Sequence, residues 1–343
     1  MTENRKLKAL KIIISILVTL IILSALSFYF ILLAPNTKEK TILLIPTEAN
    51  YQQVIDSLEA GDLLIRISSF KFAAKLLSYD KEIKSGRYSI DSNLNNKEIL
   101  KLLIRGKQEP IRFQFQNIRL KEEFAGLVGR TFETDSSSFS SLLSDSTVAR
   151  NYGFTIEDFY TMFIPNTYEI YWNTKAENLL ERFHKEYQSF WNPSRLAKAD
   201  SLGFTKAEVS ILASIVQGEA MHRDEMPAIA GLYINRLNQK MPLQADPTVI
   251  FAQQDFSIRR VLHKHLEIES PYNTYKFKGL PPGPINMPSI AAIDAVLNHQ
   301  KHAYIYMCAK DDFSGYHLFA ETWSEHLKNA RRFQQALDLR NIK

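Results

Sequence analysis

One glutamate stands where acid–base chemistry would need it. Glu219 follows Leu212, Ile215 and Val216 at helical spacing, so it lies at the end of an apolar helix face. A carboxyl group at such a position loses hydration unless it is ion-paired. Desolvation raises its pKa from about 4.3 toward roughly 6–7, a range useful to a general acid at neutral pH. The alternative is a structural carboxylate that caps a neighbouring helix or pairs with an arginine.

The sequence gives little indication of a metal site or a nucleotide-binding site. Glu219 and His222 have the Glu-x-x-His spacing of di-iron carboxylate helices, but the chain contains no second copy. His317 and His326 are further candidate zinc ligands without characteristic spacing. The sequence has no Gly-x-Ser-x-Gly elbow, phosphate-binding glycine loop or dinucleotide fingerprint. We therefore expect no metal and no cofactor.

Hydrolysis by paired carboxylates is an open alternative. Asp224, Glu225 and Asp246 are candidate partners for Glu219, since a glycoside hydrolase needs a second carboxylate as nucleophile or base. Asp224 and Glu225 also fit solvated charges near a helix start. Asp246 precedes Pro247 in an expected turn, where it would cap backbone N–H groups.

The helix that positions Glu219 has a clear beginning. Thr205 and Glu208 form a capping box, so we expect a helix over 205–220 and a second one over 226–237. Gly218 is unexplained: either the helix ends there or the backbone needs a close approach to a bound glycan. The proline-rich stretches that follow, over 243–250, 270–275 and 279–285, are predicted to be binding loops.

The remaining segments predict an α+β protein. Strands at 41–45 and 84–90 with three helices indicate a small α+β unit over 38–107, and a larger α+β domain over 111–343 follows. The serine-rich 134–147 segment is interpreted as an exposed loop with one weak helix around 139–143. The aromatic segment 163–172 fits either a sugar groove or a core. Thr322 and Glu325 predict a capping box before the last helix.

Composition excludes several other classes of function. Of the formal charge of +5, the first eleven residues carry +3, which leaves +2 for the rest, too little for a nucleic-acid surface. The single cysteine, Cys308, excludes an internal disulfide and a thiolate zinc site. Its apolar neighbours predict a buried, inert thiol.

An apolar segment near the N-terminus predicts a membrane anchor. The 22 residues from Ile12 to Leu33 carry no charge, enough to span roughly 30 Å of hydrocarbon. Basic residues precede this segment, so residues 1–11 should stay in the cytoplasm and the rest should lie outside it. A cleaved signal peptide is the rival, but no small-x-small cleavage pattern follows.

Several motifs together resemble one family. They are Leu212-Ala-Ser-Ile-Val-Gln-Gly-Glu-Ala220, Ile234-Asn-Arg-Leu237, Leu243-Gln-Ala-Asp-Pro-Thr-Val249, Ser270-Pro-Tyr-Asn-Thr-Tyr275, Gly279-Leu-Pro-Pro-Gly-Pro-Ile285, Phe163-Ile-Pro-Asn-Thr-Tyr168 and Gly315-Tyr-His-Leu-Phe319. Their order and spacing are similar to those of the endolytic murein transglycosylases (YceG-like, MltG). Ser85-Gly-Arg-Tyr-Ser-Ile90 and Glu98-Ile-Leu with Gly106 more weakly resemble that family's LysM-like domain. Many members carry an acidic residue where this chain has Gln217 and a basic one where it has Gly218.

The resemblance implies a peptidoglycan lyase in which Glu219 is the catalytic acid and then the base. It would cut nascent glycan strands between N-acetylmuramic acid and N-acetylglucosamine, leave 1,6-anhydro ends and thereby end strand elongation. Six further residues match motif positions of the family and are candidates for sugar binding and charge stabilisation: Asn235, Gln244, Asp246, Thr248, Asn273 and Tyr275. The implied location is the inner (cytoplasmic) membrane with the catalytic domain outside the cytoplasm, near peptidoglycan synthases. The rivals are a muramidase-type hydrolase and a non-catalytic peptidoglycan-binding scaffold.

Overall fold

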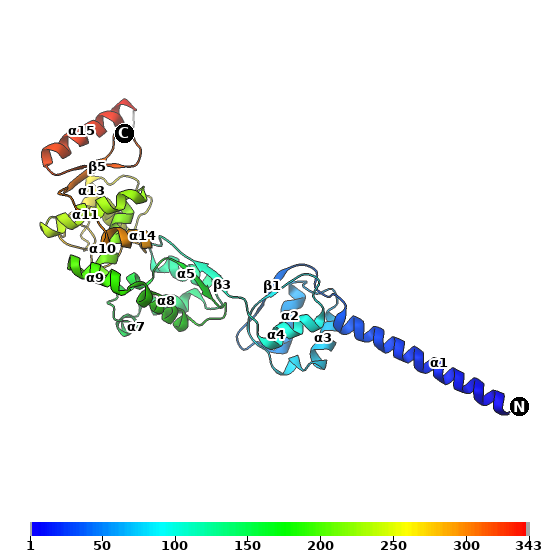
Figure 1. Cartoon of the computed structure of the whole chain (residues 1–343). Coiled ribbons are helices and arrows are strands. Elements are labelled where there is room, and N and C mark those ends of the chain that lie inside the picture. Colours follow the sequence, from blue (N-terminus) through cyan, green and yellow to red (C-terminus); the bar gives the residue numbers. More distant parts are fainter. Residues whose placement is uncertain (1, 341–343) are drawn as a thin grey trace. The chain divides into compact units, whose positions relative to one another are not determined.

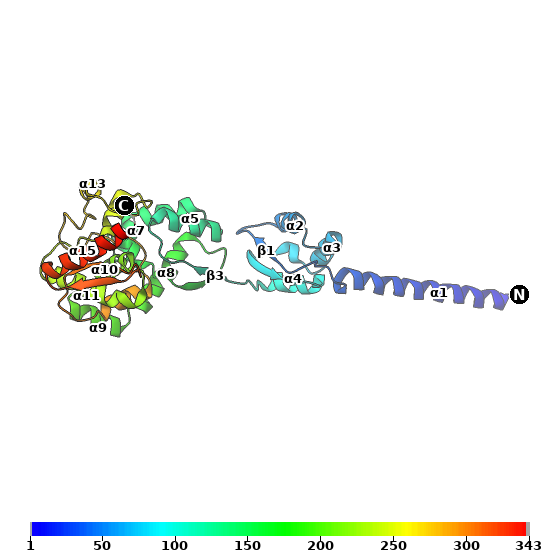
Figure 2. The ribbon, with the colours of Figure 1, turned by 90° about the horizontal axis from the view of Figure 1, so that it is seen from above.

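The computed structural model describes residues 2–340 and shows a mixed α+β protein with an apolar N-terminal helix, as the sequence predicts. The chain divides into two compact units. The first runs to Arg112 and includes the short segments Thr131–Glu133 and Glu169–Thr174, and the second contains the rest. Two perpendicular views show the elements (Figures 1 and 2).

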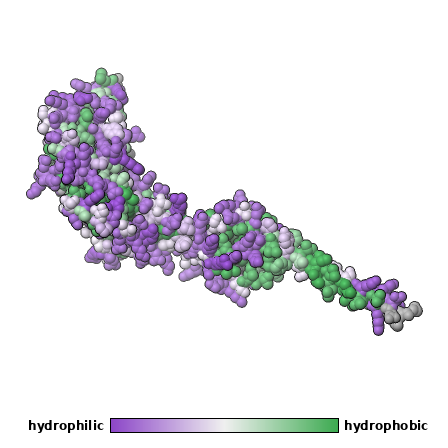
Figure 3. All heavy atoms as spheres, viewed as in Figure 1, coloured by the Kyte–Doolittle hydropathy of each residue, from purple (hydrophilic) through white to green (hydrophobic). Residues whose placement is uncertain are grey.

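The N-terminal helix has the properties of a membrane span. Helix α1 runs from Thr2 to Phe28 and continues into a π-helical turn, Tyr29–Leu33. Asn4–Leu33 contains an 18-residue window with a mean hydropathy of 2.7, so this helix is long and apolar enough to cross a bilayer. Figure 3 shows this helix covered by hydrophobic residues, with hydrophilic ones gathered near its N-terminal end. These features fit a single-pass anchor.

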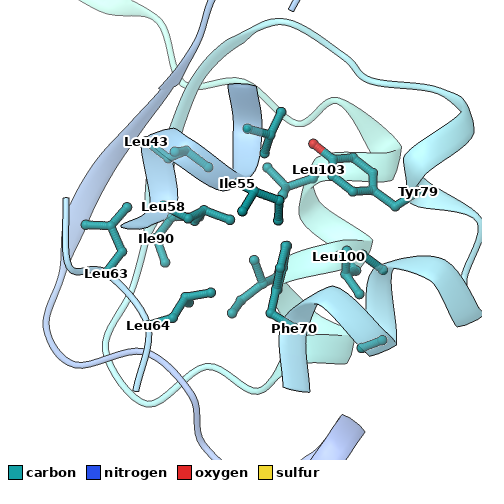
Figure 4. Close-up of a cluster of buried hydrophobic side chains, with 14 of the residues drawn as sticks. Leu43, Ile55, Leu58, Leu63, Leu64, Phe70, Tyr79, Ile90, Leu100 and Leu103 are labelled. Atoms are coloured by element: carbon teal, nitrogen blue, oxygen red, sulfur yellow. The ribbon is translucent and has the colours of Figure 1, made fainter. Parts of the chain in front are cut away.

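The first unit joins a two-stranded sheet to three helices. Strands β1 (Thr41–Ile45) and β2 (Gly86–Ile90) pair antiparallel, with Thr41 opposite Ile90 and Ile45 opposite Gly86. The helices are α2 (Tyr51–Ala60), α3 (Ile67–Leu76) and α4 (Asn96–Arg105), with a 3-10 turn at Tyr79–Lys81. Alternating strand residues and the apolar helix faces enclose one core, in which Phe70, Ile55 and Leu100 are fully buried (Figure 4).

The second unit is mainly helical. Three of its elements, β3, α5 and β4, share residues with the first unit. In sequence order the elements are β3 (Ile111–Gln114), α5 (Lys121–Thr131), α6 (Ser136–Ser144), α7 (Ser146–Asn151), β4 (Thr167–Ile170), α8 (Ala176–Phe190), α9 (Pro193–Leu202), α10 (Lys206–Glu219), α11 (Met226–Asn238), α12 (Asp246–Gln253), α13 (His263–Leu266), α14 (Ile290–Leu297), β5 (Tyr306–Ala309), β6 (His317–Ala320) and α15 (Trp323–Leu339). Short 3-10 turns lie at Phe159–Met162 and Arg223–Glu225. Strand β3 pairs with β4, and β5 pairs antiparallel with β6.

Helix α10 is the centre of the second unit. Its eight residues from Val209 to Val216 are all buried. Both ribbon views place α10 beside α9, α11 and α14 (Figures 1 and 2). The predicted capping box is confirmed: Thr205 accepts from the Glu208 N–H, and the Glu208 carboxylate accepts from the Thr205 N–H at 2.8 Å.

Two stretches that we expected to be loops are helical. The serine-rich segment forms α6 and α7, because Asp135 and Asp145 each cap a helix start and Phe139 and Leu143 are buried. The 243–250 stretch contains the start of α12, in which Pro247 occupies the first turn and Thr248 and Val249 are buried. The turn prediction was therefore wrong at Asp246, which is the first residue of that helix.

The aromatic 163–172 segment contributes to a core, one of the two alternatives that its sequence left open: Phe163 and Tyr168 are each 1% exposed, and both rings contact Phe183, whereas Tyr171 is exposed. Two further expectations need correction. The capping box before α15 is only half formed, because Thr322 accepts from the Glu325 N–H while Glu325 accepts from the Glu321 N–H. Cys308 is half-buried and not fully buried.

Candidate active site

Glu219 lies in the wall of a polar cavity of about 240 Å³ in the second unit. The cavity lies where the C-terminal end of α10, one face of α11, the start of α12 and the β5–β6 pair meet. Of the seven residues predicted to form the site, four line this cavity: Glu219, Gln244, Asp246 and Tyr275. The other lining residues are Leu232, Tyr233, Arg236, Leu243, Met307, Cys308, Ala309 and His317.

The carboxyl group of Glu219 is poised to exchange a proton near neutral pH. Burial raises its pKa to about 7, and the nearby charge of Asp246 acts in the same direction. The hydrogen bond from Tyr233, the charge of Arg236 and the Asp246 N–H oppose that rise. Tyr233, itself 1% exposed, donates its hydroxyl to Glu219 Oε1 at 2.8 Å. Glu219 therefore has a fixed orientation and a proton to give.

Asp246 and Tyr275 form a second polar pair in the cavity. The Tyr275 hydroxyl donates to Asp246 Oδ1 at 2.5 Å, and burial together with this bond raises the pKa of Tyr275. The Asp246 side chain is exposed to the cavity and belongs to the first turn of α12. Its carboxylate can therefore face a positive charge that develops in a bound substrate.

A buried arginine holds the cavity wall together. Arg236 is 7% exposed, and its Nε donates to the Ile305 carbonyl at 2.6 Å. Its Nη1 donates to the Leu243 carbonyl at 2.7 Å and lies 3.3 Å from Gln244 Oε1. Desolvation lowers the pKa of this guanidinium. Arg236 thus joins the segment before β5 to the loop that leads into α12.

Three of the predicted site residues are used inside the fold. Asn235 donates to the carbonyls of His302 and Tyr304 at 2.8 and 3.0 Å. Thr248 is fully buried against Thr274, with 2.8 Å between their hydroxyls. Asn273, also fully buried, donates to the Leu266 and Ile268 carbonyls and accepts from the Tyr275 N–H. The side chains of Thr248 and Asn273 fix the segments that carry Asp246 and Tyr275, and Asn235 fixes the segment before β5.

The glycine before Glu219 allows two helices to touch. A Cβ atom on Gly218 would lie 2.8 Å from Pro247 Cβ and 3.1 Å from its Cγ. The helix does not end at Gly218 but runs to Glu219, so the close approach is to α12. The neighbouring Gln217 accepts from the Ser289 N–H at 2.7 Å and donates to Asn286 at 3.3 Å, bonds that a carboxylate could not make in full.

The two carboxylates after Glu219 have partners of their own. Both oxygens of Glu225 face His317, at 2.7 Å from its backbone nitrogen and 2.8 Å from Nδ1. Asp224 accepts from the Tyr316 hydroxyl at 3.1 Å. Neither carboxylate lines the cavity. Asp246 is therefore the carboxylate that the structure brings to Glu219.

Cys308 and the histidines show no arrangement for metal binding. Cys308 lines the cavity, and burial raises the pKa of its thiol, which favours the unreactive protonated form. Within residues 2–340, no three His, Cys, Asp or Glu side chains group closely enough to hold a metal ion. His222 is stacked on Tyr316 at 4.0 Å and does not line the cavity that contains Glu219.

A second cavity is lined by Gly218 and Pro247, the sequence neighbours of Glu219 and Asp246 in the first cavity. Its volume is about 170 Å³. It is lined by aromatic and amide side chains and one arginine, among them Phe251, Phe256 and Arg119, whose guanidinium lies 4.8 Å from the centre of the Phe256 ring. Apolar ring faces beside amide groups are suited to binding a sugar.

Two residues that lower the pKa of Glu219, Tyr233 and Arg236, were not among the residues predicted from the sequence. Tyr233 and Arg236 are three residues apart on α11 and face the same cavity. The Ile234-Asn-Arg-Leu237 motif pointed to this turn, but we selected Asn235 from it. A charged arginine within an otherwise apolar helix face was the available signal.

The chain is similar to several known proteins. A family model described as YceG-like matches residues 43–332. A protein of Streptococcus pneumoniae strain D39 named endolytic murein transglycosylase is 28% identical over 92% of this chain and 64% of its own length. A Bacillus subtilis protein of the same name is 43% identical over 122 residues, which is 36% of this chain and 33% of that protein. The crystal structure of a YceG-like protein from Listeria monocytogenes shares the fold, with a TM-score of 0.55, 24% identity and coverage of 84% of this chain and 98% of that one.

Proposed function

The chain belongs to the YceG-like family, and on that premise we propose that it is an endolytic peptidoglycan lytic transglycosylase. The chain spans less than two thirds of the length of the pneumococcal relative, so the activity in that protein's name is extended to this chain as a proposal. The observation that carries the proposal is Glu219, with a pKa raised to about 7 in a polar cavity. A single carboxyl group of this kind suits a lyase that gives and then recovers one proton.

The proposed reaction uses Glu219 twice. Protonated Glu219 gives its proton to the oxygen that links N-acetylmuramic acid to N-acetylglucosamine, and the bond from C1 to that oxygen breaks. The muramyl C6 hydroxyl then attacks C1, and its proton passes to the Glu219 carboxylate. The product is a 1,6-anhydro ring, and the enzyme returns to its starting state without water.

The other cavity residues support the charged intermediate and the sugar. An oxocarbenium-like centre at C1 carries positive charge, which the Asp246 carboxylate can stabilise across the cavity. Tyr275 holds that carboxylate in place. Gln244 and Arg236 present an amide and a guanidinium to the substrate's oxygen atoms. Asn235, Thr248 and Asn273 would act indirectly, by fixing the loops.

Cleavage within a strand needs room on both sides of Glu219. The second cavity supplies that room on one side, with Phe251 and Phe256 as faces on which a pyranose can pack. An enzyme that released only terminal units would need a closed end instead. The two cavities therefore support endolytic cleavage of nascent strands, which would terminate their elongation.

The other parts of the chain would have distinct locations and roles in such an enzyme. Residues 1–11 would be cytoplasmic, 12–33 would cross the cytoplasmic membrane once, 38–107 would be a LysM-like domain and 111–343 the catalytic domain outside the cytoplasm. The first unit's antiparallel strand pair with packed helices is consistent with a LysM-like domain that binds glycan or acts as a spacer. Peptidoglycan synthases are the expected partners.

Digestion of purified peptidoglycan tests the proposal. The full chain in detergent should release muropeptides with anhydro ends, which are lighter by one water than reducing ends. Glu219→Gln keeps the shape and the Tyr233 contact but has no proton to give, so we expect its rate to fall by at least about 10³-fold. Anhydro products at an undiminished rate in this variant would contradict the role of Glu219.

The same digest separates the two rivals. Reducing-end products would indicate a hydrolase with Asp246 as the second carboxylate. Binding to peptidoglycan without any products would indicate a scaffold.

A further inference from the structure

A buried carboxylate, that of Glu225, holds one histidine of the cavity wall in position. Glu225 is 7% exposed and lies in the 3-10 turn before α11. Its Oε1 accepts from the His317 backbone N–H at 2.7 Å, and its Oε2 lies 2.8 Å from His317 Nδ1. Burying a carboxylate costs free energy. Glu225 is buried and binds one residue through two groups, the backbone N–H and the ring nitrogen Nδ1 of His317, and this arrangement requires an explanation.

The contact determines how the imidazole faces the substrate. A carboxylate only accepts hydrogen bonds, so the tautomer of the His317 imidazole that this contact selects has its hydrogen on Nδ1. The other nitrogen, Nε2, then carries a lone pair. His317 lines the same cavity as Glu219, and Nε2 has no hydrogen-bond partner in the described part of the chain. In this tautomer the cavity contains an acceptor that the proposed role of Glu219 does not use.

The segments on either side hold this arrangement firmly. Tyr316 donates to Asp224 at 3.1 Å and stacks on His222 at 4.0 Å, and His222 Nε2 lies 2.8 Å from the Ser314 carbonyl. On the other side, His317 begins β6 and pairs with Ala309 of β5, which also lines the cavity. Such support from both neighbours is typical of a side chain whose orientation matters.

We propose that His317, oriented by Glu225, is a second catalytic residue whose Nε2 accepts a hydrogen bond from the muramyl C6 hydroxyl. This inference rests on the proposed function. While Glu219 still carries the proton for the leaving group, and its Oε1 already accepts from Tyr233, the C6 hydroxyl needs another acceptor. A hydrogen bond to Nε2 turns the hydroxyl hydrogen away from C1, so that an oxygen lone pair faces C1. Once Glu219 has given its proton to the leaving oxygen, it is a carboxylate that can accept, and the hydroxyl hydrogen turns from Nε2 to Glu219 as the C6 oxygen bonds to C1. The proton therefore passes to Glu219, and His317 neither gains nor loses one.

Paired substitutions test this role in the full chain in detergent. His317→Asn keeps an amide at the Nδ1 position but has nothing at Nε2. Glu225→Gln offers an N–H to Nδ1, so the ring hydrogen moves to Nε2 and the acceptor is lost. We expect each to lower kcat for anhydro product about 10–100-fold, with KM changed less than about 3-fold. The double variant should be no slower than His317→Asn, since both changes remove the same acceptor.

Conservative rescue and a control complete the test. His317→Gln places an amide near the Nε2 position and should recover part of the lost kcat. His299→Asn replaces a half-buried histidine outside the cavity lining and should match the wild type. Full kcat in a folded His317→Asn variant, or a loss confined to KM, would overturn the inference. Products with reducing ends from the wild type would instead overturn the proposed function, so the two failures are distinguishable.

Discussion

At the scale of single residues, Glu219 balances opposing influences on one proton. Burial and the Asp246 charge favour the protonated form, whereas the hydroxyl of Tyr233 and the charge of Arg236 favour the carboxylate. The resulting pKa of about 7 lets the same group donate and then accept. A fully apolar pocket would raise the pKa of Glu219 further, and the group would then be a poorer proton donor at neutral pH.

This balance predicts the pH dependence of the reaction. The first step needs protonated Glu219, so the initial rate of anhydro-product release should fall as the pH rises through about 7. Tyr233→Phe removes a hydrogen bond that lowers the pKa of Glu219, so its rate should begin to fall at a higher pH than that of the wild type. Initial rates between mildly acidic and alkaline pH would show both effects. A wild-type rate that stays flat across this range, or a fall at lower pH in Tyr233→Phe, would contradict the argument.

The sequence predicted the catalytic candidate but not its surroundings. Glu219 follows from helical spacing, which is a local property of α10. Its partner Tyr233 comes from α11 and Asp246 from α12, and their approach depends on how these helices pack. Local patterns also do not show that Asn273 points into its own loop, because its carbonyl partners are fixed only by the folded backbone.

At the scale of elements, the site depends on the contact between α10 and α12. Pro247 in the first turn of α12 packs on Gly218, which brings the Asp246 N–H and carboxylate to Glu219. We predicted a turn at Asp246 because proline is common in turns. Proline is also common in the first turn of a helix. The choice between them is made by burial of Thr248 and Val249, which the local sequence does not show.

A methyl group at Gly218 should disturb this contact. The new Cβ would lie 2.8 Å from the rigid Pro247 ring, so α12 must move. Overpacking typically costs about 1–3 kcal/mol, and the helix gains about 1 kcal/mol from alanine. We therefore expect Gly218→Ala to lower the free energy of unfolding by up to about 2 kcal/mol and to reduce activity at least about 10-fold, because Asp246 is displaced.

Gly126→Ala is the matched control for this substitution. Gly126 lies inside α5, and a Cβ there would approach only the flexible end of Arg130, at 3.2 Å. We expect it to raise stability by up to about 1 kcal/mol and to leave activity unchanged. Thermal unfolding and the digestion rate measure both variants. Gly218→Ala with wild-type stability and activity would show that α12 does not depend on this contact.

At the scale of the whole molecule, the apolar helix α1 leads directly into the core of the first unit. Leu32, in the π-helical turn after α1, is 6% exposed and belongs to the first unit's core. Asn96 donates to the Ile31 carbonyl at 2.7 Å and also accepts from Asn36 at 2.7 Å, and both asparagines are fully buried. Buried amide pairs of this kind fix the path of the chain, so a flexible tether does not separate the anchor from this unit.

The proposed orientation in the membrane can be tested with single cysteines. Basic residues in the first turns of α1, before the uncharged segment 12–33, predict that residues 1–11 are cytoplasmic and that everything after residue 33 is outside. In a Cys308→Ala background, which has no other thiol, Ser201→Cys should react with a membrane-impermeant maleimide in spheroplasts, because Ser201 is exposed in the second unit. Lys8→Cys should react only after the membrane is permeabilised. Labelling of Lys8→Cys in sealed spheroplasts, with protection of Ser201→Cys, would place the catalytic unit in the cytoplasm and remove its access to peptidoglycan. Recovery of both variants in the soluble fraction would show instead that the helix is not an anchor.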